Sequence, residues 1–346
     1  MTFRDGLAPS SQTGADARAA IFAGSLVLLV AVVENAMRRV LYTGFYSPEP
    51  CIYFLMTTVT QVDKAMQFRQ LHRGPRALVL ANVWDVASAR IIQSAGFPAL
   101  ATTSAGIAFS LGYPDGQRIP REEMMARIGR IARAVTVPVS ADIEAGYGPT
   151  PNDAARTTHE LIEAGAIGMN LEDLSGDSER PLLEVSVAVE KIKAARLAAA
   201  QLRVPMVVNA RTDVFMLAGG DARSKYDDAL RRLTAYRDAG ADCVFAPGVK
   251  DAETIGRLVR DLQCPVNILA VPGIPSIPEL EQLGVARVSM GSGPMRATLG
   301  LLIRIADEIK SSGTYSNLNT GVPHAEMNKM LSLPNISQRS ANALKH

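Results

Sequence analysis

The chain has 346 residues, of which 47% are hydrophobic and 20% are charged, so it is long enough and apolar enough to form a large folded core. Its 36 lysine and arginine residues almost balance its 34 aspartate and glutamate residues. The resulting net charge of +2 provides no basic field for a phosphate backbone, which argues against nucleic acid as a partner.

Residues 1–67 form an N-terminal extension ahead of the main repeating pattern, and they contain an apolar run over residues 19–33. The run is short for a bilayer, because a helix needs about 20 apolar residues to cross the hydrocarbon core. No small-residue cleavage site of the Ala-x-Ala kind follows it. Three interpretations stay open: a non-native extension with Met56 as the true initiator, a membrane or interfacial anchor, and an accessory helix packed on the main domain.

The cysteines are Cys51, Cys243 and Cys264, an odd number without Cys-x-x-Cys spacing. A disulfide framework or a zinc site would need pairs or clusters, whereas isolated thiols in apolar runs simply pack. We therefore expect a protein of the reducing cytoplasm.

From residue 77 onward the sequence repeats one pattern eight times: a short β-branched apolar run, a polar or glycine-containing loop, and a stretch with helical apolar spacing. The predicted strands cover residues 77–81, 99–103, 137–143, 168–171, 206–210, 243–246, 266–270 and 287–290. The predicted helices cover residues 85–94, 121–133, 153–163, 183–199, 225–238, 252–261 and 294–310. Several of them end in a glycine that suits a left-handed C-cap.

Strict alternation of apolar strands with helices indicates a parallel sheet covered on both faces, and eight units over about 235 residues are typical of a closed (β/α)₈ TIM barrel. An open doubly wound sheet is the alternative, but no Gly-x-Gly-x-x-Gly follows the first strand. We assign the barrel to residues 68–315. The tail over residues 316–346 is predicted to be irregular, with one short helix around residues 325–331.

Acidic residues gather where the strands end, which is where a barrel of this type carries its reactive groups. Asp142 and Glu144 are two positions apart, so the alternation of a strand places both on one face, toward the barrel mouth. Glu172 ends the neighbouring strand, and Asp115 lies in the long second loop. These carboxylates are therefore expected to converge.

Carboxylates in an apolar cup repel one another unless a cation lies among them. Oxygen ligands favour Mg²⁺, with Mn²⁺ as a substitute, and no histidine or cysteine cluster is present that would select zinc. The four histidines are interpreted as surface or helix-packing residues: His72, His159, His324 and His346.

Other polar residues near these strand ends have two interpretations each. Asp173 and Asp213 suit helix capping or loop hydrogen bonding as well as ligation. Arg211 suits bidentate binding of a substrate carboxylate or phosphonate, or serves as an internal counter-ion to Glu172. The stretch over residues 102–106 offers amides and hydroxyls to an anionic oxygen.

Six motifs, in order and spacing, resemble the isocitrate lyase and phosphoenolpyruvate mutase superfamily. They are Asn82-Val83-Trp84-Asp85, Thr103-Ser104-Ala105-Gly106, Gly112-Tyr113-Pro114-Asp115, the run from Asp142 to Gly148, Asn170-Leu171-Glu172-Asp173 and Ala210-Arg211-Thr212-Asp213. The match extends over about residues 68–315 and includes 2-methylisocitrate lyase-like and oxaloacetate decarboxylase-like members.

The resemblance implies a role for each matching position. Asp142 corresponds to the direct Mg²⁺ ligand, whereas Glu144, Glu172 and Asp115 correspond to carboxylates that hold the ion through its waters. The substrate-binding residues are expected to be Ser104, Ala105, Gly106, Trp84, Arg211 and Asn267. The family also exchanges its eighth helix between subunits, so residues 294–310 are an expected oligomer contact in a homodimer or homotetramer.

The loop after the fourth strand departs from the family. Residues 174–181 read Leu-Ser-Gly-Asp-Ser-Glu-Arg-Pro, without the cysteine and lysines of the lyases or the lysine and asparagine of the mutases. Decarboxylation tolerates this loss, because departure of CO₂ leaves no proton to abstract. Arg211, Glu172 and Tyr147 are the candidate catalytic residues, and Arg180 is a further group that could assist.

We therefore expect a Mg²⁺-dependent carbon–carbon lyase or decarboxylase that acts on a small 2-oxo or 2-hydroxy acid and stabilises an enolate. Phosphorus–carbon chemistry, as in phosphoenolpyruvate mutase or phosphonopyruvate hydrolase, is a second hypothesis. A non-catalytic binder of 2-oxo acids is the third, because a shortened loop closes the site less well against water.

Overall fold

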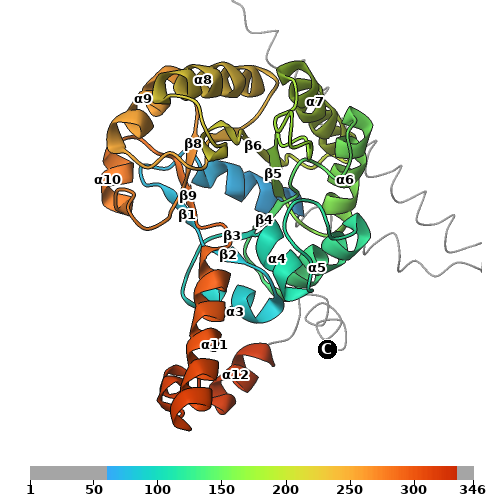
Figure 1. Ribbon diagram of the computed structural model, residues 1–346. Coiled ribbons are helices and arrows are strands. Elements are labelled where there is room, and N and C mark those ends of the chain that lie inside the picture. The colour runs from blue at the N-terminus through green and yellow to red at the C-terminus, as the bar shows by residue number, and fades with distance from the viewer. Residues whose placement is uncertain (1–60, 333–346) are drawn as a thin grey trace, which may run out of the picture. The chain divides into compact units, whose positions relative to one another are not determined.

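Nine parallel strands form one sheet that curls into a nearly closed barrel with helices around it (Figure 1). The computed structural model describes residues 61–332. The strands are β1 Leu78–Leu80, β2 Asn82–Val83, β3 Leu100–Thr102, β4 Val139–Asp142, β5 Gly168–Glu172, β6 Val207–Arg211, β7 Cys243–Phe245, β8 Val266–Leu269 and β9 Arg287–Ser289. The predicted (β/α)₈ barrel is confirmed: β1 lies within the first predicted strand, over residues 77–81, and β2 is a two-residue strand directly after it.

The helices agree with the predicted ones except for two short additions and the helix over residues 61–71, which is described below. They are α3 Val86–Ser94, α4 Ser104–Ser110, α5 Arg121–Ala134, α6 Pro151–Glu163, α7 Val185–Gln201, α8 Ala222–Asp238, α9 Ala252–Leu262, α10 Ile277–Gln282, α11 Gly293–Ser312 and α12 His324–Leu331, with 3₁₀ turns η1 Val214–Met216 and η2 Ser316–Thr320. The predicted tail helix is α12. The helices α4 and α10 were not predicted, because both are too short to show a helical period.

Capping residues explain where several helices begin. The carboxylate of Asp85 accepts a hydrogen bond from the main-chain N–H of Ser88, and the Ser88 hydroxyl accepts one from the Asp85 N–H. Thr150 and Asp153 form the same reciprocal pair at the start of α6. Such pairs satisfy amides that have no partner within the helix, which fixes the helix start directly after the strand-end loop.

The seam of the barrel lies between β1 and β2. β1 pairs with β9, whereas β2 pairs with β3, so backbone pairing changes sides at Ala81. Asn82 bridges this break with its side chain. Its Oδ1 accepts hydrogen bonds from the amides of Met290, at 2.7 Å, and Gly291, at 3.0 Å, and its Nδ2 donates to the Thr102 carbonyl, at 2.8 Å. A single amide side chain thus joins the last strand to the first.

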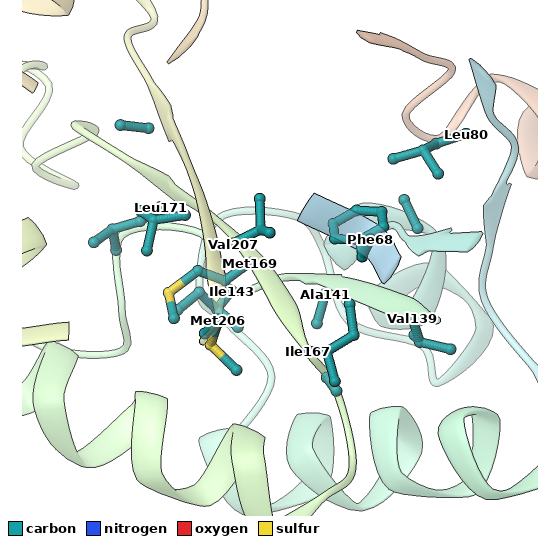
Figure 2. Close-up of a cluster of buried hydrophobic side chains, with 14 of the residues drawn as sticks. Phe68, Leu80, Val139, Ala141, Ile143, Ile167, Met169, Leu171, Met206 and Val207 are labelled. Carbon is teal, nitrogen blue, oxygen red and sulfur yellow. The ribbon is translucent and has the colours of Figure 1, made fainter. Parts of the chain in front are cut away.

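A helix over residues 61–71 closes the N-terminal end of the barrel. Its Ala65 and Phe68 are fully buried, and Phe68 belongs to the same apolar cluster as side chains from β4 and β5 (Figure 2). Gly168 makes room for this ring, because a Cβ there would lie 2.8 Å from Phe68 Cε1. The helix therefore starts before residue 68, where the barrel was predicted to begin.

Helix α11 extends away from the barrel instead of covering it (Figure 1). Met295 is its one buried residue, whereas Leu302 and Ile303 are 58% and 63% exposed. A cavity of about 820 Å³ lies beside β1, and its lining includes the half-buried Val79 together with Leu71 and Phe97. The barrel is thus left without cover from its own last helix.

The predictions for residues 1–60 lie outside the described residues, and so do Cys51 and His346. In the part of the chain that the structure describes, no helix is long and apolar enough to span a bilayer. Cys243 and Cys264 are free thiols. His72 packs edge-on against Phe68, in line with a packing role.

Candidate active site

Three neighbouring strands bring their polar end residues together at the carboxyl end of the barrel. β4 ends at Asp142, β5 at Glu172 and β6 at Arg211. The register pairs Asp142 with Asn170, and Glu172 with Arg211, so the three side chains stand at adjacent positions around the mouth. Of the four carboxylates that were expected to converge, these strand ends carry Asp142 and Glu172.

Asp142 has one oxygen bound by protein and one without a protein partner. Its Oδ2 accepts hydrogen bonds from the Ser104 hydroxyl, at 2.8 Å, and from the Ser104 amide, at 3.3 Å. Its own amide donates to Thr102 Oγ1, at 3.0 Å. Its Oδ1 is buried and makes no hydrogen bond within the described residues. A buried carboxylate oxygen needs a partner, so this atom is the natural point of attachment for a cation.

Glu144 lies in a left-handed backbone conformation, with φ of 51°, directly beside Asp142. Its Oε2 accepts a hydrogen bond of 2.5 Å from the Gln117 amide, and its Oε1 accepts one of 3.4 Å from the Tyr147 hydroxyl. Burial, together with the negative charges of Asp142 and Asp115, raises the pKa of Glu144 to about 7. Without a cation nearby, burial and the neighbouring negative charges therefore oppose ionisation of Glu144.

The pKa values of the other two predicted carboxylates, Asp115 and Glu172, are raised for similar reasons. Burial raises the pKa of Asp115, and the charge of Asp142 adds to the effect. Burial also raises the pKa of Glu172 well above its usual range, although Arg211 opposes the shift. A cation would relieve this repulsion, since carboxylates of raised pKa regain their charge when a positive ion is near.

Within residues 61–332, no three histidine, cysteine, aspartate or glutamate side chains lie close enough together to surround a metal ion. Mg²⁺ commonly binds through one or two carboxylates and keeps several waters. Asp142 Oδ1 would thus be the direct ligand, and the remaining carboxylates would face the ion's waters.

Arg211 is paired on both sides. Its Nη1 contacts Glu172 Oε2 at 2.8 Å, and its Nη2 and Nε donate to Asp213 Oδ1 at 2.7 and 3.0 Å. The counter-ion role that the sequence allowed is therefore present. These pairs fix the orientation of the planar guanidinium at the end of β6.

Asp173 serves the scaffold, as its alternative interpretation suggested. It accepts hydrogen bonds from the Thr212 hydroxyl and the Tyr236 hydroxyl, both at 2.7 Å, and from Arg232 Nη1, at 3.2 Å. These contacts tie the end of β5 to β6 and α8. Asp213, by contrast, orients Arg211 and has its Oδ2 buried without a hydrogen bond among the described residues.

The predicted anion cradle is the first turn of α4. Thr103 caps this helix, because its hydroxyl accepts a hydrogen bond from the Gly106 amide, at 3.2 Å. Ser104 already contacts Asp142, so it links the cradle to the carboxylates. A Cβ on Gly106 would lie 2.5 Å from Thr103 Cγ2 and 3.2 Å from Trp84 Cβ, so only glycine fits against Trp84.

The remaining predicted residues occupy different positions. Asn267 lies fully buried inside the barrel, where its Nδ2 donates to Ser289 Oγ, at 3.1 Å. Tyr147 is half-buried, and burial together with Glu144 raises its pKa, so its hydroxyl keeps its proton. Trp84 also lines an outer cavity of about 280 Å³, beside Arg127. Arg180 is exposed in the loop after β5 and faces Asp177, at 3.6 Å.

Several residues at the site were not predicted. Gln117 joins the loop of Asp115 to that of Glu144, because its side-chain oxygen also accepts from the Tyr147 amide, at 2.7 Å. Arg287 crosses the barrel interior and donates to Asn170 Oδ1, at 3.2 Å. Burial lowers its pKa to about 10. The one signal in the sequence that could have identified Arg287 is its position as a charged residue at the start of an apolar strand.

Comparisons with known proteins agree with this architecture. Residues 68–310 match the family model described as phosphoenolpyruvate phosphomutase. An uncharacterized protein of Mycobacterium tuberculosis is 39% identical, over 77% of this chain and 96% of that protein. Oxaloacetate decarboxylase 2 of Pseudomonas fluorescens is 31% identical, over 65% of this chain and 76% of that protein.

Two further comparisons extend the same relationship. The 2-methylisocitrate lyase of Bacillus subtilis is 34% identical, over 61% of this chain and 68% of that protein. A solved structure from Burkholderia cenocepacia is 41% identical, with a TM-score of 0.75, over 80% of this chain and 98% of that chain. The barrel together with the family match places the chain among TIM-barrel proteins related to lyases and mutases. The chain belongs to the phosphoenolpyruvate mutase and isocitrate lyase superfamily.

Proposed function

We propose that the protein is a Mg²⁺-dependent carbon–carbon lyase or decarboxylase that acts on a small 2-oxo or 2-hydroxy di- or tricarboxylic acid. The observation that carries the proposal is Asp142, whose Oδ1 is buried without a protein hydrogen bond in the described part of the chain, beside carboxylates of raised pKa. The names of the decarboxylase and lyase relatives support the substrate class.

Each group has a role in this proposal. Bound Mg²⁺ would supply Lewis-acid stabilisation of negative charge on a substrate oxygen. Ser104 and the first turn of α4 hold the substrate's carboxylate end, and Arg211 neutralises its far carboxylate while Asp213 keeps the guanidinium in place. Trp84 and Asn267 stay proposals for substrate contact.

Decarboxylation is the reaction that this set of residues performs with least help. The bond to the leaving carboxylate breaks, CO₂ departs, and its bonding electrons stay on the substrate, so no base is needed for this step. A proton must then reach the carbon. Tyr147 is our proposed donor, because its raised pKa keeps the hydroxyl protonated next to Glu144.

The test is a turnover screen of the purified protein with Mg²⁺ against oxaloacetate, 2-methylisocitrate, isocitrate and phosphonopyruvate, beside an Asp142→Ala variant and a protein-free Mg²⁺ blank. The blank is needed because oxaloacetate loses CO₂ slowly with free metal ions. We expect Mg²⁺-dependent pyruvate, glyoxylate or succinate formation that falls by at least about a hundredfold in the variant. Turnover that survives Asp142→Ala would contradict the assigned role of Asp142.

Phosphorus–carbon chemistry is the second candidate, because the matching family model carries the name of a phosphomutase. A new phosphonate or phosphate signal in phosphorus NMR would favour it over carbon–carbon cleavage. A third outcome, binding of 2-oxo acids without turnover on any substrate, would indicate a binder. The loop after β5 motivates this last test, since a Leu174–Leu182 bridge closes it into a short turn.

We also propose a homo-oligomer in which α11 of one subunit packs on another copy. The exposed apolar residues of α11 and the apolar cavity beside β1 support this arrangement. The proposed location is the cytoplasm.

A further inference from the structure

The loop that follows β4 adopts a strained course. Glu144 and Tyr147 have φ of 51° and 56°, although side chains disfavour this region, and Gly146 has φ of 88°. Each such residue costs about 1 kcal/mol or more, so the surrounding structure must hold the loop in place. The loop carries Glu144 and follows directly after Asp142, so its shape sets the geometry of the proposed metal site.

Lys191 lies beneath this loop. It comes from the middle of α7, and the residue is 1% exposed. Its ammonium group donates hydrogen bonds of 2.7 Å to the Ala145 carbonyl and 2.6 Å to the Gly148 carbonyl. The Lys191 side chain therefore binds the main chain of the loop on both sides of Tyr147.

The two hydrogen bonds of the buried Lys191 ammonium group go to main-chain carbonyls and not to a carboxylate. Both acceptors are neutral carbonyl oxygens, and the negative charge that favours the protonated amine belongs to Asp153. Burial of an ammonium group is costly unless its N–H groups are bound, and the same contacts satisfy carbonyls that the left-handed turns leave without strand partners. The loop carbonyls and the lysine ammonium group thus satisfy each other's hydrogen-bonding needs.

We propose that Lys191 is a positioning residue, which holds residues 143–148 from below so that Glu144 and Tyr147 face Asp142. Gln117 holds the same loop from the opposite side through Glu144 and Tyr147. The proposal deepens the proposed function and rests on it where metal binding is concerned. The ammonium group of Lys191 binds main-chain carbonyls of the loop, so we infer that it acts through the loop.

The test compares Lys191→Met and Lys191→Arg with two control variants on the same helix. Lys193→Met removes an exposed lysine that pairs with Glu190 at 2.9 Å, and Ile192→Ala destabilises the core without touching the loop. Hydrogen exchange of peptides covering residues 143–148 is measured on metal-free protein. Mn²⁺ affinity is measured by electron paramagnetic resonance, well below each melting temperature.

In Lys191→Met, we expect loop amides to exchange about tenfold faster and Mn²⁺ to bind about tenfold more weakly, since two charged hydrogen bonds are lost. Lys191→Arg should recover part of both effects, and it serves as the test if Lys191→Met does not fold. Unchanged exchange in the folded Lys191 variants would overturn the proposal, as would equal effects from Ile192→Ala. If the unaltered protein binds no Mn²⁺, the proposed function fails, whereas the exchange data still decide the role of Lys191.

Discussion

Glu144 makes the proposed metal site sensitive to pH. Its pKa of about 7 means that the metal-free protein holds a proton there across the mildly acidic range. A metal ion must displace this proton, so binding and ionisation are linked. We expect Mn²⁺ affinity to rise about tenfold per pH unit up to about pH 7 and then to level off.

The measurement is a Mn²⁺ titration by electron paramagnetic resonance at about four pH values between about 5.5 and 8.5, chosen to span this pKa. Glu144→Gln is the matched variant, because it removes the titrating group and keeps the size. Its affinity should vary less with pH than that of the unaltered protein. A slope that is identical in both would assign the titration to another carboxylate, with Glu172 as the next candidate.

The same pKa shift has a consequence for stability. A carboxyl group with a raised folded-state pKa stabilises the fold fully below its ordinary value of 4.5 and loses this contribution as pH rises through about 7. The metal-free protein is therefore weakened by Glu144 over this window. The difference in melting temperature between Mg²⁺ and EDTA should grow with pH there.

At the residue scale, the sequence predicted groups that follow from strand alternation. Asp142 and Glu172 end β4 and β5, whereas Glu144 lies beyond the end of β4 in a left-handed conformation, so strand alternation does not place it. Gln117 and Lys191 were not found, since their roles depend on main-chain atoms of a loop that is distant in the sequence. No local pattern marks a lysine that binds carbonyl groups 43 and 46 positions away.

At the element scale, the helix over residues 61–71 closes the N-terminal end of the barrel, where Phe68 packs against Gly168. Gly168→Ala should destabilise the protein by about 1–3 kcal/mol, because its new Cβ would meet Phe68 Cε1 at 2.8 Å. Phe68→Ala should cost about 3–5 kcal/mol by leaving a cavity. Together the two changes should cost less than their sum, because the smaller side chain removes the clash.

Urea denaturation of both single variants and the double variant measures this coupling. Gly74→Ala is the control, since a Cβ there would meet no atom closer than 3.7 Å. Costs that simply add would show that Phe68 and Gly168 do not share this space.

The long elements were predictable and the short ones were not. Helices such as α6 and α8 carry a helical apolar spacing and are followed by a glycine, Gly165 and Gly240, so their bounds agree with the prediction within a few residues. α4 reads as a loop because its sequence, Ser-Ala-Gly-Ile-Ala-Phe-Ser, is brief and contains glycine near its start. Its helical form depends on the Thr103 cap and on packing against Trp84, neither of which is a local signal.

At the scale of the whole molecule, α11 is the proposed contact between subunits. Leu302 and Ile303 are largely exposed on it, so a Leu302→Glu and Ile303→Glu double variant should abolish assembly. Burying two carboxylates in an apolar contact costs about 2 kcal/mol or more each. Light scattering coupled to gel filtration measures the mass.

Leu197→Glu is the matched control, because Leu197 is 61% exposed on α7, away from α11. It should keep the oligomer of the unaltered protein. An oligomer that survives the double change in α11 would rule out this helix as the contact.

The seam at Asn82 also orders events during synthesis on the ribosome. Among residues 61–332, β1 pairs with β9 alone, and the Asn82 side chain accepts a hydrogen bond from the amide of Met290, 208 positions later. Contacts of such separation form slowly and cannot form before the last strand has emerged. The nascent chain therefore carries an open sheet, with both edges unpaired, until β9 has been synthesised. Because α11 follows β9 directly, the proposed contact with another copy becomes available only when the barrel can also close.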